Sequence, residues 1–145
     1  MFYKKFENYI VVRIEKNEEL VSTLKKFCEK EKILAGTILS CIGAANKIEI
    51  GIFNTETKSY NSTIRTGDHE ITSVSGNITT MNEQVYLHLH ATVADESLSI
   101  FGGHLNSAIV SATCEIVLAP ITERIERFFD KESGLNLIKL SSREK

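Results

Sequence analysis

The feature that most constrains the fold is a run of strict two-residue alternation over residues 85–94. One set of alternate positions is entirely apolar, whereas the other set includes Tyr86, His88, His90 and Thr92. Because successive side chains of a β-strand point to opposite faces, this pattern predicts a strand with one buried face. The opposite face of that strand then presents two histidines on the same side of a sheet.

Short β-type segments recur along the rest of the chain. We predict strands over residues 9–14, 33–43, 47–53, 59–66, 70–80, 98–101, 108–118 and 135–140, with turns or breaks at 44–46, Gly67-Asp68 and Gly102-Gly103. Only residues 20–28 carry an apolar stripe with helical spacing, and Asn17 is the predicted cap of that helix. Many strands with one main helix predict an α+β domain of mostly antiparallel sheet. The length of 145 residues suits a single domain over 1–145.

Composition narrows the class of partner. The chain has 17 Lys and Arg against 19 Asp and Glu, so its net charge is −2. Nucleic-acid-binding domains usually carry a basic stripe, and the scattered lysines of this chain disfavour DNA as a partner. The three distant cysteines (Cys28, Cys41 and Cys114) predict reduced thiols. With no pattern typical of a signal peptide or a membrane span, we expect a cytoplasmic protein without membrane partners.

Three of the four histidines form a candidate metal site. His88 and His90 are two residues apart on one strand, which places their side chains roughly 7 Å apart on the same side. His104 follows Gly102-Gly103, whose missing side chains let the backbone pass close to a neighbouring strand. Three histidines plus a water molecule are a common zinc arrangement, and neutral imidazole also binds Ni, Cu or Fe. We therefore predict a divalent metal site, with zinc as the first choice.

Other polar residues have two interpretations each. Glu115 and Glu70 are candidates to support the metal ligands or to act as an acid or base, or they are surface residues of the sheet. Cys41 is a core residue or a nucleophile, and the core interpretation is favoured. Arg13 is an anion site or an exposed or salt-bridged strand residue, and the second interpretation is favoured. His69 is expected to be solvated in a turn.

At the residues of the candidate site, the chain resembles the plant and prokaryote conserved (PPC) domain over about residues 9–121. Three motifs carry this resemblance: Ser73-Val74-Ser75-Gly76-Asn77, Leu87-His88-Leu89-His90-Ala91 and Gly102-Gly103-His104-Leu105. The resemblance implies an α+β domain that assembles as a homotrimer. In prokaryotic members the matching histidines hold a metal, usually zinc, and this property carries over to His88, His90 and His104.

The sequence leaves three functions open. The first is a stand-alone trimeric module that binds a small molecule or a protein and uses the metal as part of that site. The second is a metal-dependent lyase or hydrolase acting on a small metabolite, because the histidine pattern is also similar to that of acetolactate decarboxylase. The third is a DNA-associated regulator, although the AT-hook of plant members does not occur in this sequence. Neither the substrate nor a catalytic role of the metal follows from the residues.

Overall fold

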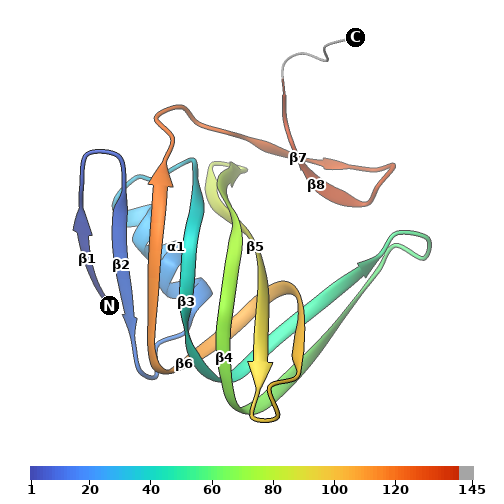
Figure 1. The fold of residues 1–145 in the computed structure, drawn as a ribbon. Helices are drawn as coiled ribbons and strands as arrows, with labels where there is room; N and C mark the ends of the chain where they lie inside the picture. Colours follow the sequence, from blue (N-terminus) through green and yellow to red (C-terminus); the bar gives the residue numbers. More distant parts are fainter. Residues whose placement is uncertain (141–145) are drawn as a thin grey trace.

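The fold is an antiparallel sheet with one helix, as the computed structural model shows for residues 1–140 (Figure 1). The elements are β1 (Phe2–Lys5), β2 (Ile10–Glu15), α1 (Leu20–Lys30), β3 (Gly36–Asn54), β4 (Ser59–Met81), β5 (Gln84–Asp95), β6 (Ile100–Pro120), β7 (Arg127–Asp130) and β8 (Leu135–Ile138). The predicted α+β class is confirmed. Within these residues, no helix is both long enough and apolar enough to cross a membrane.

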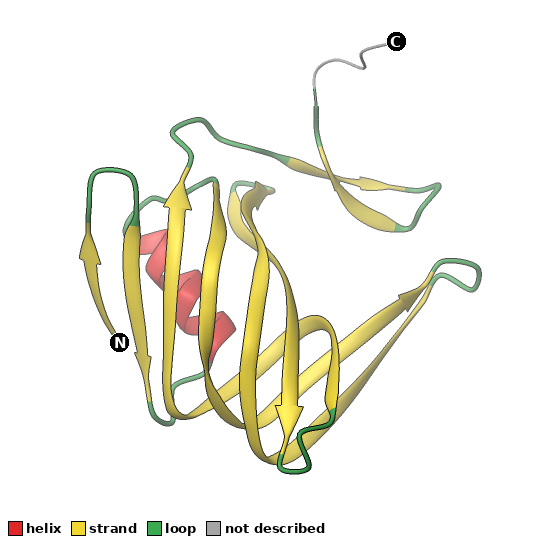
Figure 2. Cartoon of the chain, viewed as in Figure 1, coloured by secondary structure: helices red, strands yellow, loops and turns green. Residues whose placement is uncertain are grey.

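The main sheet has the strand order β1-β2-β6-β3-β4-β5, and β5 also pairs with β6. The strands β6, β3, β4 and β5 therefore form a closed ring, to which β2 and β1 add on one side. Helix α1 covers one face of this sheet (Figure 2). The core lies between them, and it includes Leu24 and Phe27 of the helix and Val12, Ile48 and Ile116 of the sheet.

Three strands, β3, β4 and β6, are longer than their sequence patterns predict. The predicted turn at 44–46 is wrong, because β3 continues through it with a register shift between Ala45 and Lys47. The predicted turn at Gly67 is also wrong, because β4 continues through it and Gly67 adopts a φ of 108°. These bent strands extend the tip of the β3–β4 hairpin well beyond the rest of the sheet (Figure 1). This tip, residues 47–66, is hereafter called the arm.

The glycine pair in β6 does not break the strand, which contradicts the predicted break. Gly102 and Gly103 lie inside β6 and pair with Thr92 and Ala91 of β5. A Cβ atom at Gly103 would lie 2.7 Å from the carbonyl oxygen of Gly51, too close for any real side chain. The pair therefore allows β6 to pass closely between β5 and β3, which is the close approach that the sequence predicted.

The helix begins differently from the prediction. Glu19 is the N-cap, and its carboxylate accepts hydrogen bonds from the backbone N–H groups of Val21 and Ser22. The same carboxylate accepts a third bond of 3.0 Å from the N–H of Ala108 in β6. Asn17 lies in the preceding turn with a φ of 69°, so the prediction that it caps the helix is wrong. Glu19 is favoured because it ties the helix to the sheet as well as capping it.

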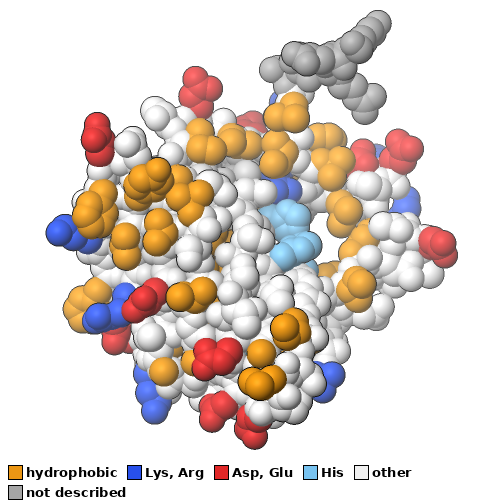
Figure 3. Space-filling model, in the orientation of Figure 1, with side chains coloured by type: hydrophobic (Ala, Val, Ile, Leu, Met, Phe, Trp, Pro, Cys, Tyr) orange, Lys and Arg blue, Asp and Glu red, His pale blue; other side chains and the backbone are white. Residues whose placement is uncertain are grey.

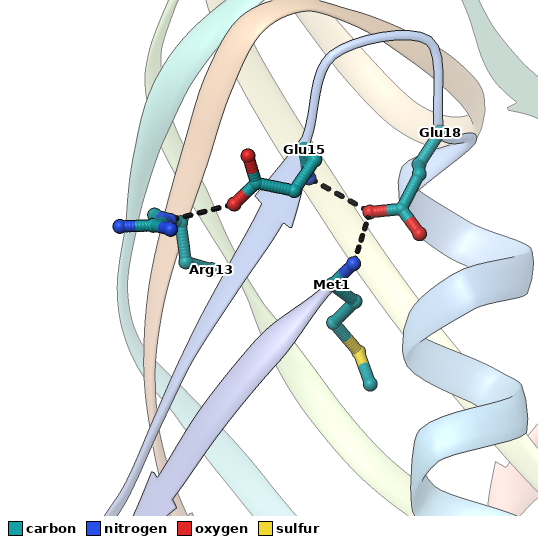
Figure 4. Close-up of polar contacts among 4 residues, drawn as sticks. All are labelled: Met1, Arg13, Glu15 and Glu18. Atoms are coloured by element: carbon teal, nitrogen blue, oxygen red, sulfur yellow. Dashed lines mark hydrogen bonds and ion pairs between the residues drawn. The ribbon is translucent and has the colours of Figure 1, made fainter.

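A small polar network joins β1, β2 and the turn before the helix (Figure 4). The Glu18 carboxylate accepts a hydrogen bond of 2.8 Å from the N–H of Glu15 and forms an ion pair of 2.7 Å with the amino group of Met1. The bond to this ammonium group lowers the pKa of Glu18. Arg13 forms an ion pair of 2.6 Å with Glu15, which confirms that Arg13 is a salt-bridged strand residue.

The cysteines and the fourth histidine are buried. The sulfur atoms of Cys41 and Cys114 lie 3.5 Å apart, and both cysteines are free thiols in the core. The hydrogen bond between them and their burial raise the pKa of Cys41, so this residue is a poor nucleophile and the core interpretation is confirmed. His69 is only 6% exposed, and its Nδ1 atom lies 2.8 Å from the carbonyl oxygen of Gly67. The prediction of a solvated His69 is therefore wrong.

Candidate metal centre and ligand pocket

The three predicted histidines meet on the outer face of the strand ring. His90 of β5 and His104 of β6 are direct cross-strand partners, and His88 lies two residues before His90 on the same face. The three ring centroids are separated by 5.1, 5.3 and 5.6 Å. One ring nitrogen from each residue can be chosen so that all three lie within 4.8 Å of one another. The structure therefore brings together three histidines from β5 and β6, which the sequence analysis had grouped from their spacing alone.

The environment of the cluster favours neutral imidazole. His88 and His104 are partly buried, while His90 is exposed. Desolvation, followed by the positive charge of Arg127 and the two neighbouring rings, lowers the pKa of His88 to about 4. Desolvation and His90 also lower the pKa of His104. At neutral pH these rings are therefore uncharged, which is the form that binds metal ions.

The donor set fits a divalent transition metal ion. Zinc binds imidazole nitrogen at about 2.0–2.1 Å, and three ring nitrogens within 4.8 Å of one another form a set that could hold one such ion. Three protein ligands leave a fourth position for water or for a ligand. Zinc bound here by His88, His90 and His104 would supply Lewis-acid chemistry at that position.

Arg127, at the start of β7, is a site residue that the sequence analysis missed. It is only 8% exposed. Its Nε atom donates to Thr79 Oγ1 at 2.8 Å, and its Nη2 atom donates to Asn77 Oδ1 at 2.7 Å. The same Nη2 atom lies 3.4 Å from Nδ1 of His88. The sequence pointed to this region only through Asn77, which ends the first of the three family motifs. Asn77 pairs with His88 across β4 and β5.

A pocket of about 1100 Å³ opens in front of the histidines. Its floor is the β5–β6 face, and its walls come from the arm and from the β7–β8 hairpin. The side chains are mostly apolar or aromatic, among them Ile52, Phe53, Phe129, Leu135 and Leu137. In the space-filling view, histidine side chains lie in a hollow beside a basic side chain and apolar surface (Figure 3). The pocket has the size and lining of a small-molecule site.

Tyr60 shapes the arm side of this pocket. Its ring packs over Gly51, where any side chain would overlap with it, and it meets the His104 ring edge-on at a centroid distance of 6.0 Å. Its hydroxyl group donates a hydrogen bond of 2.8 Å to Asn106 Oδ1. This bond holds the ring in place against the histidine cluster.

The two predicted glutamates lie elsewhere on the chain. Glu115 and Glu70 line a second pocket of about 520 Å³, together with Ile42 and Thr113. Both glutamates are exposed, and neither lines the histidine pocket. Within one chain, the polar neighbours on the β4 and β7 side of the cluster are therefore Asn77 and Arg127 rather than a carboxylate.

The fold and the site together define a class: a small antiparallel β-domain that carries a three-histidine cluster beside a largely apolar pocket. The chain belongs to the Plants and Prokaryotes Conserved (PCC) domain family, whose model matches residues 1–122. This is the family that the three sequence motifs predicted. Arg127 and the β7–β8 hairpin lie beyond the matched residues.

Solved structures and curated relatives share this fold or sequence. A protein from Bacteroides thetaiotaomicron, provisionally described as DNA-binding, is 40% identical with a TM-score of 0.92, over 95% of this chain and 96% of that one. A metal-containing protein from Archaeoglobus fulgidus is 32% identical with a TM-score of 0.85, over 97% and 100% of the two chains. The bifunctional protein GlmU of Synechococcus sp. (strain JA-2-3B'a(2-13)) is 29% identical over 131 residues, which are 85% of this chain and 18% of GlmU. The chain thus spans less than a fifth of the length of the curated relatives it matches.

Proposed function

We propose that this chain is a homotrimeric ligand-binding protein that holds a divalent metal ion, zinc first, through His88, His90 and His104. The observation that carries this proposal is the convergence of three imidazole side chains on the floor of a pocket large enough for a small molecule. Histidines that merely fill a sheet surface have no reason to gather at one point, especially where two of the rings, those of His88 and His104, lose solvation. The similarity to an archaeal protein described as metal-containing supports a bound metal.

Metal analysis of the purified protein tests this proposal. Expression in medium with trace zinc, followed by dialysis and elemental mass spectrometry, should give about one divalent ion per chain. Protein that is purified without metal should bind the same amount when zinc is added. A folded protein that binds less than a tenth of this amount under both conditions would overturn the proposal.

The trimer is supported by apolar surface that one chain leaves uncovered. Val11, Leu39 and Ile42 are exposed on β2 and β3, and Ile52 and Ile64 are exposed on the arm. Soluble monomers rarely expose extensive contiguous apolar surface. We expect light scattering at micromolar concentration to give three times the 16.2 kDa chain mass. A concentration-independent monomer or dimer mass would contradict this assembly.

A metal-dependent lyase or hydrolase acting on a small metabolite is the second candidate. The observation that favours it is the open side of the cluster, because a metal with three protein ligands can activate water or polarise an oxygen atom of a substrate. The pocket in front of the histidines gives a small molecule access to that position.

A DNA-associated role is the third candidate, and its main support is the description given to the Bacteroides protein. The charge of −2 per chain, or about −6 in a trimer, opposes binding to a polyanion. We predict no binding to AT-rich duplex DNA tighter than about 10⁻⁵ M at physiological salt, as measured by fluorescence anisotropy. Submicromolar affinity with a steep salt dependence would instead favour the regulator.

A further inference from the structure

Arg127 is a buried cation whose partners among residues 1–140 are all neutral. Its guanidinium group contacts Thr79, Asn77, His88 and the backbone carbonyl of Asn136. It also lies over the ring of Tyr86, 5.0 Å from the ring centroid. Among residues 1–140, no carboxylate forms an ion pair with it. A buried charge is costly unless it is paired, so this position favours an anion that residues 1–140 do not supply.

The pocket as a whole is also short of negative charge. Within the described part of the chain, none of the lining residues is Asp or Glu, and Arg127 is the one Lys or Arg. A divalent ion on the histidines would add two further positive charges close to the guanidinium group. Like charges at such a distance repel each other strongly in a partly desolvated site. An anion that touches both centres would turn this repulsion into attraction, so the metal and the anion should support each other's binding.

The remaining donors and the shape of the pocket narrow the class of anion. The three shorter bonds of Arg127 use three of its five N–H groups, and the contact to His88 is the longest at 3.4 Å. The remaining N–H donors of Arg127 can therefore bind one small anionic group. A phosphate dianion usually contacts several basic side chains, so a carboxylate fits this position better. The walls formed by Phe53, Phe129 and Leu135 suit a hydrocarbon body.

We propose that the pocket binds a small carboxylic acid with an apolar body, whose carboxylate takes the open metal position and faces Arg127. This inference rests on the proposed metal site. The carboxylate would replace the missing counter-ion of Arg127, while the apolar part would lie between the arm and the β7–β8 hairpin. Arg127 and the β7–β8 hairpin, which lie outside the family match, would thus help to decide which ligand is bound, and the histidines would supply the common anchor.

Cobalt-loaded full-length protein tests the proposal, because the visible absorption of Co²⁺ responds to a change of ligand at the open position. Sodium butyrate is the probe, and butyramide is the neutral probe of the same shape. We expect butyrate to change the spectrum with saturation and butyramide to leave it unchanged. Arg127→Gln should weaken butyrate binding about tenfold or more, with cobalt content maintained. Arg124→Gln, which removes an exposed arginine paired with Glu126, should bind butyrate like the wild type.

The outcomes separate this inference from the proposed function. Failure of the wild type to bind cobalt would overturn both. Normal cobalt binding with equal responses to butyrate and butyramide, or with an unchanged butyrate affinity in Arg127→Gln, would overturn the carboxylate site and leave the metal site standing. Should Arg127→Gln fail to fold, Arg127→Lys retains the charge but loses the planar donor array, and it should bind butyrate more weakly than the wild type. An unchanged affinity in Arg127→Lys, together with equal responses to the two probes, would count against the proposal.

Discussion

Replacing both His88 and His90 by alanine is expected to remove the metal while the protein stays folded. The double variant retains only His104 of the three ligands, and a single imidazole cannot hold zinc against dialysis. Both replaced side chains lie on the outer face of β5, opposite the buried Leu89 and Ala91. The core packing is therefore unchanged, apart from the stabilisation that a bound metal adds to the folded state.

Elemental mass spectrometry and circular dichroism of the wild type and variant measure this effect. Metal content should fall from about one ion per chain to less than about a tenth of that value. The matched control is His69→Ala, which removes the histidine outside the cluster. This control should keep its metal but lose stability, because His69 is buried and its ring nitrogen contacts the carbonyl oxygen of Gly67. Full metal occupancy in the double variant would show that the ion binds elsewhere.

Gly76→Ala is expected to destabilise the protein strongly, although it adds only one methyl group. Gly76 pairs with Leu89 where β4 meets β5, and a Cβ atom would overlap with the carbonyl oxygen of His88. The obstacle is backbone on a central strand, so it cannot move without disturbing the strand pairing beside the histidine cluster. We expect a loss of about 3 kcal/mol in the free energy of unfolding. The midpoint of thermal unfolding should fall by about 10 °C.

Thermal and urea unfolding at one fixed protein concentration measure this loss, since assembly makes apparent stability depend on concentration. Ser75→Ala is the control on the same strand, because Ser75 is exposed and its replacement removes only a hydroxyl group. It should shift stability by less than about 0.5 kcal/mol. Equal stability of the two variants would mean that β4 and β5 do not approach as closely as the structure shows.

The family and the strand pattern could be predicted because both depend on local order in the sequence. The motifs around Gly76, His88 and Gly102 were sufficient for the resemblance, and the family match confirms it. Strand boundaries were less predictable. Residues 44–46 and 67–68 were predicted as turns, yet β3 and β4 continue through a register shift at these positions, with paired residues on either side. Pairing across strands overrode the local preference.

The sequence by itself determined that His88 and His90 share one face of a strand, because side-chain alternation in a β-strand does not depend on what surrounds it. It also indicated that Gly102-Gly103 bring His104 close to a neighbouring strand. Only the tertiary structure decided that Arg127 reaches this face and that Glu115 and Glu70 do not. Their positions depend on which distant strands become neighbours. Long-range strand pairing, and the contact of the segment around β7 with β4, determine these positions. No local sequence pattern encodes them.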